Sequence, residues 1–303
     1  MVDKTCLEKM KGIVVPILTP IDKEEKIDEA KLREQVEFVI KGGVLGILAF
    51  GSNGEFYMVE EDEMRHALEI MISQADGRVP VFMGIGAINT MKAVRIAKMA
   101  QGCGAFGISV LQPMFLKPTE EELYLHFKTI AKAVPDTPML LYNNPGRTGY
   151  TMSADLVVRL AEELDNVVGM KDSSGDMTQT EEFIRRTRHL GFKVFGGKDT
   201  LIYGALVHGA AGCVATTANF VPEMVVSIYD KYAGGDITGA RDAQYALNPI
   251  RLLMDKASFP VGTKDMANIV GLDVGNPYTP NLPTGGEVLE KMRQALAAAG
   301  YAK

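Results

Sequence analysis

Short runs of apolar residues recur along the chain, and each is followed by turn residues and then by a longer stretch with helical periodicity. Eight such runs begin near Ile13, Gly46, Val79, Ala105, Met139, Val167, Lys193 and Gly212. Strands that alternate with helices indicate parallel strands joined by helical crossovers. Eight strand–helix units are the number found in a (β/α)8 barrel. The pattern therefore predicts a TIM barrel of the α/β class.

The segments between the runs carry helix signals. Residues 28–41 place their apolar side chains mainly on one side, and Thr119 with three following glutamates forms a capping box. Beyond the eighth unit, the chain predicts three further helices, at residues 239–254, 260–270 and 286–299. We expect residues 1–236 to form the barrel. Residues 237–303 are expected to form a C-terminal helical extension packed on the barrel, not an independent domain.

A doubly wound open sheet is the alternative fold, and it would need a phosphate-binding loop after its first strand. The segment Gly102-Cys103-Gly104-Ala105-Phe106-Gly107 matches the dinucleotide fingerprint letter for letter. It precedes an apolar run instead of following one, so the helix N-terminus that would hold a pyrophosphate is missing. The segment is better explained as the loop before the fourth strand, where glycine ends the preceding helix.

The composition argues against several classes of function. The net charge is −6 and no basic stripe is visible, which argues against nucleic-acid binding. Three cysteines without paired spacing exclude a zinc knuckle, make a disulfide framework unexpected and fit a reducing cytoplasm. His66 and His126 fall in helical stretches without ligand spacing, so we expect them at the surface or in an interface.

The chain also lacks the signals of a membrane or exported protein. No apolar run approaches the length of a membrane span, and residues 1–9 contain no apolar core of a signal peptide. A cytoplasmic location is therefore expected.

Lys171 ends the apolar run Val167-Val168-Gly169-Met170, and the turn residues Asp172-Ser173-Ser174-Gly175 follow at once. The pattern predicts a buried strand that ends at this lysine. A lysine in an apolar setting can carry a free amine near neutral pH, because burial disfavours the ammonium form. Such an amine can attack a ketone and form a Schiff base. The alternative is a strand-end lysine that extends to solvent or pairs with Asp172.

Active sites of such barrels lie at the C-terminal ends of the strands, which selects three further segments: residues 50–55, residues 142–149 and Gly196-Gly197-Lys198-Asp199. Gly51-Ser52-Asn53-Gly54 can present backbone N–H groups and a hydroxyl to a carboxylate, although it also fits an ordinary turn. Tyr142 is predicted beside Lys171, where its phenol can move a proton, or it is a core tyrosine. Arg147 follows a Pro-Gly turn and can pair with a substrate carboxylate, or it is a surface arginine.

These motifs, with Tyr142-Asn143-Asn144-Pro145-Gly146-Arg147-Thr148-Gly149 and Gly169-Met170-Lys171-Asp172, stand in the order and spacing of a known family. The chain resembles the dihydrodipicolinate synthase / N-acetylneuraminate lyase family over essentially its whole length. The resemblance implies a lyase of the class I aldolase type, in which Lys171 forms a Schiff base with pyruvate and Tyr142 shuttles a proton. It implies that Ser52 and Asn53 bind the pyruvate carboxylate, with Ser52 also taking part in catalysis. It further implies that Gly197 and Val214 line the pyruvate pocket.

The resemblance also implies a homotetramer built as a dimer of dimers, with no added cofactor and no metal. The second substrate is an aldehyde. Arg147 favours the dihydrodipicolinate synthases, in which an arginine here holds the carboxylate of aspartate semialdehyde. Two departures argue against this: Ser52-Asn53 replaces two threonines, and Pro113-Met114-Phe115 replaces a segment whose second tyrosine completes a proton relay in the neighbouring subunit.

The best hypothesis is therefore a dihydrodipicolinate synthase that condenses pyruvate with a carboxylate-bearing aldehyde. The alternatives are an aldolase or dehydratase of 2-keto-3-deoxy sugar acids, an enzyme like N-acetylneuraminate lyase, or a non-catalytic barrel that binds a keto acid. In lysine-regulated synthases, the inhibitor lies at a dimer interface beside segments that match residues 56–61 and 87–92 here. Lys92 stands where an acid is expected to receive the lysine amine, so we expect no inhibition by lysine.

Overall fold

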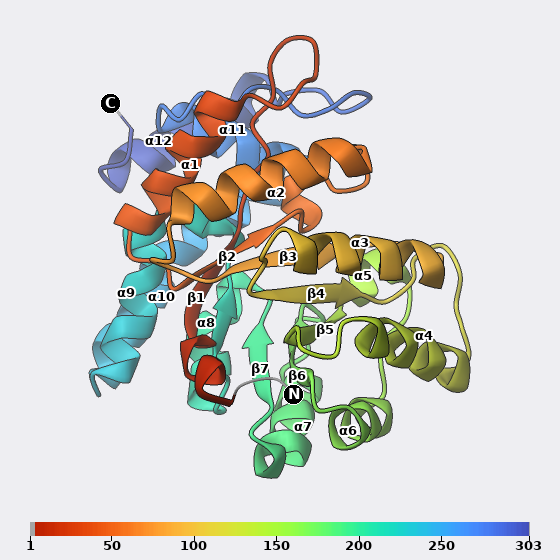
Figure 1. The fold of residues 1–303 in the computed structure, drawn as a ribbon. Helices are drawn as coiled ribbons and strands as arrows, with labels where there is room; N and C mark the ends of the chain where they lie inside the picture. Colours follow the sequence, from red (N-terminus) through yellow and green to blue (C-terminus); the bar gives the residue numbers. More distant parts are fainter. Residues whose placement is uncertain (1–3, 303) are drawn as a thin grey trace.

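A closed barrel of eight parallel strands, hydrogen-bonded in chain order from β1 to β8, forms the centre of the computed structural model (Figure 1). The structure describes residues 4–302. Residues 1–3 of the segment 1–9, in which no signal peptide was expected, lie outside the described residues. The predicted (β/α)8 barrel is confirmed. The strands are β1 Gly12–Pro16, β2 Gly46–Ala49, β3 Val81–Ile85, β4 Gly107–Leu111, β5 Met139–Asn143, β6 Val167–Asp172, β7 Lys193–Gly196 and β8 Gly212–Val214.

Helices cover the outside of the barrel, and three of them follow the last barrel helix (Figure 1). Asp28 caps the first helix and Thr119 forms the predicted capping box with Glu122, which satisfies N–H groups that a helix start otherwise leaves unpaired. The helices are α1 Glu29–Lys41, α2 Glu61–Ala75, α3 Thr90–Gly102, α4 Glu120–Ala133, α5 Pro145–Thr148, α6 Ala154–Glu163, α7 Met177–Thr187, α8 Ile202–Val207, α9 Pro222–Ala233, α10 Ile237–Met254, α11 Val261–Ile269 and α12 Gly286–Ala298.

The strands separate two apolar clusters, because successive side chains of a strand point to opposite faces. The larger cluster lies between the strands and the helices. The smaller one fills the barrel interior with one residue from most strands: Val14, Leu48, Phe82, Leu140, Val168, Phe195 and Val214, together with Met10. This packing fills the barrel interior, and in such barrels the active site lies at the C-terminal end of the strands.

The C-terminal extension contacts the barrel through specific hydrogen bonds. On α10, Gln244 donates to the carbonyl of Asp199 and accepts from the N–H of Tyr203, both of which follow β7. On α11, Thr263 and Lys264 contact the loop after β2. The extension therefore reaches the same end of the barrel at which the strands finish.

Two sequence predictions about single segments can be compared with the structure. The segment that resembled a dinucleotide fingerprint is the loop between α3 and β4, as expected, and Gly104 in it adopts a positive φ of 82°. His126 was expected at the surface or in an interface, but it is 5% exposed and bonds to Thr90 through Nδ1. It is buried because it lies on the side of α4 that packs against α3. Burial lowers its pKa to about 4.

Within residues 4–302, no helix combines the length and the apolarity that crossing a membrane requires.

Candidate active site at the C-terminal end of the barrel

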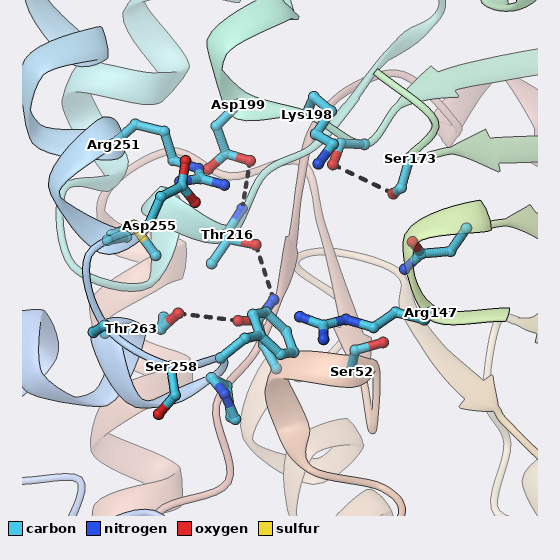
Figure 2. A pocket seen from close by; sticks show the side chains of 18 of the residues that line it. Ser52, Arg147, Ser173, Lys198, Asp199, Thr216, Arg251, Asp255, Ser258 and Thr263 are labelled. Atoms are coloured by element: carbon cyan, nitrogen blue, oxygen red, sulfur yellow. Dashed lines mark hydrogen bonds and ion pairs between the residues drawn. The ribbon is translucent and has the colours of Figure 1, made fainter. Parts of the chain in front are cut away.

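A cavity of about 240 Å³ opens where the strands end (Figure 2). It brings together six of the seven predicted site residues, namely Ser52, Asn53, Tyr142, Arg147, Lys171 and Gly197. The seventh, Val214, is not on the cavity wall. Its side chain points into the barrel interior and packs in the apolar cluster there. The cavity is also lined by residues to which the sequence analysis assigned no role: Asn144, Ser173, Lys198, Asp199, Thr216, Arg251, Met254, Asp255, Ala257, Ser258, Phe259, Pro260, Gly262 and Thr263.

Lys171 lies on β6, one residue before the strand ends, and is 4% exposed. Its Nζ lies 4.2 Å from the centre of the Tyr142 ring. The carboxylate of Asp172 points away, and it accepts hydrogen bonds from the side chains of Asn143 and Thr180. Among the described residues Lys171 forms no ion pair. The two alternatives considered for this lysine, extension to solvent and pairing with Asp172, are therefore both excluded by its position.

Tyr142 lies directly across from Lys171, since β5 and β6 pair these two residues in register. Burial by itself raises the pKa of Tyr142, whereas the neighbouring positive charge of Lys171 lowers it. Hydrogen bonds from surrounding side chains add to the lowering, and the net result is a pKa below the ordinary value of a phenol; these side chains are Ser52, Ser173 and Asn144. A phenol that ionises more readily is better suited to exchange a proton with a reacting group.

The turn after β2 has the geometry of an anion-binding nest. Ser52–Gly54 form one 3-10 turn in which the N–H groups of Gly54 and Glu55 donate to the carbonyls of Gly51 and Ser52. The N–H groups of Ser52 and Asn53 have no acceptor within residues 4–302. Two adjacent free N–H groups at a turn suit a carboxylate.

The side chain of Asn53 is held by two hydrogen bonds to other parts of the chain. Its Nδ2 donates to Thr216 Oγ1 at 2.8 Å, and its Oδ1 accepts from Thr263 Oγ1 at 3.1 Å, as Figure 2 shows. The amide is thus occupied by two threonines from distant segments. A carboxylate would meet the backbone N–H of Asn53 rather than its side chain.

Arg147 belongs to the short helix α5, which begins at Pro145 and ends at Gly149 with φ 82°. The predicted rigid turn is therefore present. The guanidinium stacks on the ring of Phe259, 4.2 Å from its centre, and lines the cavity. Among the described residues it has no carboxylate partner, and a surface pairing with an acid is absent.

Two other features shape the mouth of the cavity. A Cβ at Gly197 would lie 2.0 Å from Ser173 Oγ, so this wall requires glycine. Phe115, which replaces the expected relay tyrosine, is 92% exposed and does not line the cavity of its own chain.

Some of these residues lie where the sequence rule pointed. Lys198 and Asp199 follow β7 in a segment that the strand-end rule had selected, and Thr216 follows β8, where the same rule could have found it. The segment from Arg251 to Thr263 belongs to the extension and follows no strand. It carried no local signal that would have placed it at the cavity.

Comparisons with known proteins agree with this geometry. Residues 9–299 match the sequence model of the Dihydrodipicolinate synthetase family. The 4-hydroxy-tetrahydrodipicolinate synthase of Methanopyrus kandleri is 32% identical over 293 residues, which cover 96% of this chain and 97% of the relative. The enzyme of the same name from Pelobacter propionicus is 35% identical over 275 residues, which cover 91% of this chain and 93% of the relative.

Solved structures of this group superpose closely. A dihydrodipicolinate synthase of Thermotoga maritima has a TM-score of 0.93 at 29% identity, covering 96% of this chain and 99% of that one. A prophage protein of Escherichia coli K12, described as belonging to the dihydrodipicolinic acid synthase family and solved in complex with pyruvate, has a TM-score of 0.91 at 26% identity. The match covers 96% of this chain and 99% of the prophage protein.

Proposed function

Since this chain belongs to the dihydrodipicolinate synthetase family, we propose that it is a 4-hydroxy-tetrahydrodipicolinate synthase that condenses pyruvate with aspartate semialdehyde. The observation that carries the proposal is the buried amine of Lys171, which has no acidic partner within residues 4–302 and lies over the Tyr142 ring at the wall of a cavity. A buried amine without an acid beside it is available as a nucleophile.

Lys171 Nζ attacks the ketone carbon of pyruvate, and the carboxylate is held by the N–H groups of Ser52 and Asn53. Tyr142 protonates the departing hydroxyl, so water leaves and a C=N bond forms. Loss of a proton from the methyl carbon then gives an enamine, whose carbon attacks the aldehyde. The amino group of the aspartate semialdehyde then attacks the C=N carbon, which closes the ring of the product and releases the Lys171 amine.

Arg147 supports the choice of an acidic aldehyde. Its guanidinium lines the cavity without a carboxylate of the protein beside it. Charge-assisted pairing with a planar carboxylate is the strongest contact that such a group can make there.

A second candidate, an aldolase of 2-keto-3-deoxy sugar acids, is favoured by one observation. Phe115 has no hydroxyl and therefore cannot relay a proton as the tyrosine of the synthases does. The non-catalytic barrel is disfavoured, because a binding protein gains nothing from Tyr142 held across from an unpaired Lys171.

We also propose the homotetramer built as a dimer of dimers. Large apolar side chains are exposed in the segments after β2, β3 and β4, which are neighbours in the barrel; they are Tyr57, Ile88, Met91, Phe115 and Leu116. Exposed apolar groups gathered in this way are typical of an interface. A cytoplasmic location fits the free thiols of Cys103 and Cys213.

Trapping with borohydride tests the proposed chemistry. Incubation with pyruvate and borohydride should add one reduced pyruvate to the peptide that contains Lys171, as measured by mass spectrometry. A turnover screen of pyruvate with acidic and neutral aldehydes then separates the two enzymes. Labelling at Lys198, or no labelling, contradicts the Schiff-base mechanism, and a preference for neutral sugar aldehydes moves the assignment to the sugar-acid aldolases.

A further inference from the structure

The cavity has a wall that no strand of the barrel provides. Most residues from Met254 to Thr263, which connect α10 to the start of α11, line it; Asp255, Ser258 and Thr263 are labelled in Figure 2. We propose that Thr263 of α11 is a positioning residue for the pyruvate carboxylate. The buried ion pair between Lys264 and Glu55 holds the Ser52–Gly54 turn against α11. This inference rests on the proposed binding of pyruvate at the Ser52–Gly54 turn.

Thr263 acts on the turn through one hydrogen bond. Its Oγ1 donates to Asn53 Oδ1, while Asn53 Nδ2 donates to Thr216 Oγ1. The Asn53 amide is thus fixed at both of its ends, from α11 and from the segment after β8. Because the side chain cannot rotate, the direction of the Asn53 backbone N–H is fixed as well. That N–H is one of the two free donors of the nest.

The turn needs such support, because its backbone is unfavourable on both sides. Phe50 before it and Glu55 after it adopt φ values of 50° and 52°, in the left-handed region that residues other than glycine rarely occupy. Backbone of this kind persists only where the surrounding structure determines it. Thr19 supplies one further contact, since its hydroxyl donates to the Gly54 carbonyl at 2.8 Å.

The second support is an ion pair that is closed to solvent. Lys264 Nζ lies 2.8 Å from Glu55 Oε2, and both side chains are 0% exposed. Lys264 also donates to the carbonyl of Asn276, and Glu55 Oε1 accepts from the N–H of Tyr278. The pair therefore ties the residue after the turn to α11 and to the segment that follows α11.

The ion pair also removes an electrostatic conflict. Glu55 directly follows the turn, and an uncompensated carboxylate there would repel the carboxylate of pyruvate. Lys264 neutralises it without entering the cavity, since it is absent from the cavity wall. The nest thus keeps its positive N–H groups for the substrate while α11 supplies the counter-charge from behind.

A pair of substitutions at Thr263 tests the proposal. Thr263→Val keeps the shape and removes the hydroxyl, whereas Thr263→Ser keeps the hydroxyl. The pyruvate concentration for half-maximal borohydride labelling of Lys171 should rise about 10-fold in Thr263→Val, the usual range for a buried group left without its partner. It should stay within about twofold of wild type in Thr263→Ser. Labelling at saturating pyruvate should be unchanged in both, because the Lys171 amine is untouched.

Thr187→Val is the matched control. Thr187 is also a buried threonine, 0% exposed, whose hydroxyl donates to the carbonyl of Phe183 within α7, far from the cavity. This variant should label like the wild type. Equal half-maximal concentrations for Thr263→Val and wild type overturn the inference, as does an equal rise in Thr187→Val. Failure of the wild type itself to label contradicts the proposed function, and the inference falls with it.

Discussion

Two buried lysines lie near the candidate pyruvate site, one on the cavity wall and one behind the turn after β2, and they differ in what each one contacts. Lys171, on β6, has no ion pair among the described residues and borders the cavity. Lys264, on α11, is fully enclosed and pairs with Glu55 at 2.8 Å. Burial lowers the pKa of Lys264, while Glu55 opposes that shift. The partner, not the depth of burial, therefore separates a lysine suited to chemistry from one that holds the structure together.

Removal of the unpaired lysine should cost activity and spare the fold. We expect Lys171→Ala to lower turnover on the order of 10⁴-fold or more, the scale seen when a covalent nucleophile is removed. The thermal midpoint should stay the same or rise, because no buried carboxylate loses its partner. Steady-state kinetics and thermal denaturation measure the two effects. A loss of stability as large as that of the Lys264 variant below would remove the distinction between the two lysines.

Removal of the paired lysine should lower the stability of the fold. Lys264→Met leaves the Glu55 carboxylate buried and alone, and breaking a buried pair in this way costs about 3–5 kcal/mol of unfolding free energy. Urea denaturation measures this loss. The double variant Glu55→Gln, Lys264→Met should recover most of it, because neither charge remains. If the double variant is as unstable as the single one, the ion pair is not the cause.

Arg147 extends the comparison to a third cation, one that is unpaired but exposed. Arg147→Ala should weaken the use of aspartate semialdehyde by about 10-fold to 100-fold, the range for loss of one charged hydrogen bond. Labelling of Lys171 by pyruvate should persist, since Arg147 acts on the aldehyde. The ratio of kcat/KM for acidic and neutral aldehydes gives the result. An equal loss for both kinds would assign Arg147 a structural role through its stacking on Phe259.

The smallest effect is expected at a fourth cation, which is exposed and has an acidic partner. Lys92 lies 3.8 Å from Glu61 and lines a groove of about 430 Å³ beside residues 56–61. A cation there repels the amine of a bound lysine, so millimolar lysine should leave the rate unchanged. Inhibition at submillimolar lysine in a standard rate assay would refute this prediction.

Much of the site could be predicted because it follows local rules. An apolar run ending in Lys171, and another containing Tyr142, are enough to place both residues at the ends of adjacent parallel strands. Arg147 was found in the same way, from the turn after β5. Val214 was selected by the family resemblance alone, and its side chain packs in the apolar cluster of the barrel interior, a placement that depends on the register of the closed barrel.

The amino-acid sequence by itself determined the eight strand–helix units, the barrel class and the position of Lys171 near the end of its strand, because each depends on neighbours close in the chain. Only the tertiary structure showed that Asn53 is held by Thr263, 210 residues away, and that Glu55 is neutralised by Lys264. These contacts have no signature in periodicity or motif. They arise when the barrel closes and the extension folds back over its C-terminal end, which brings polar groups out of water and requires each to find a partner.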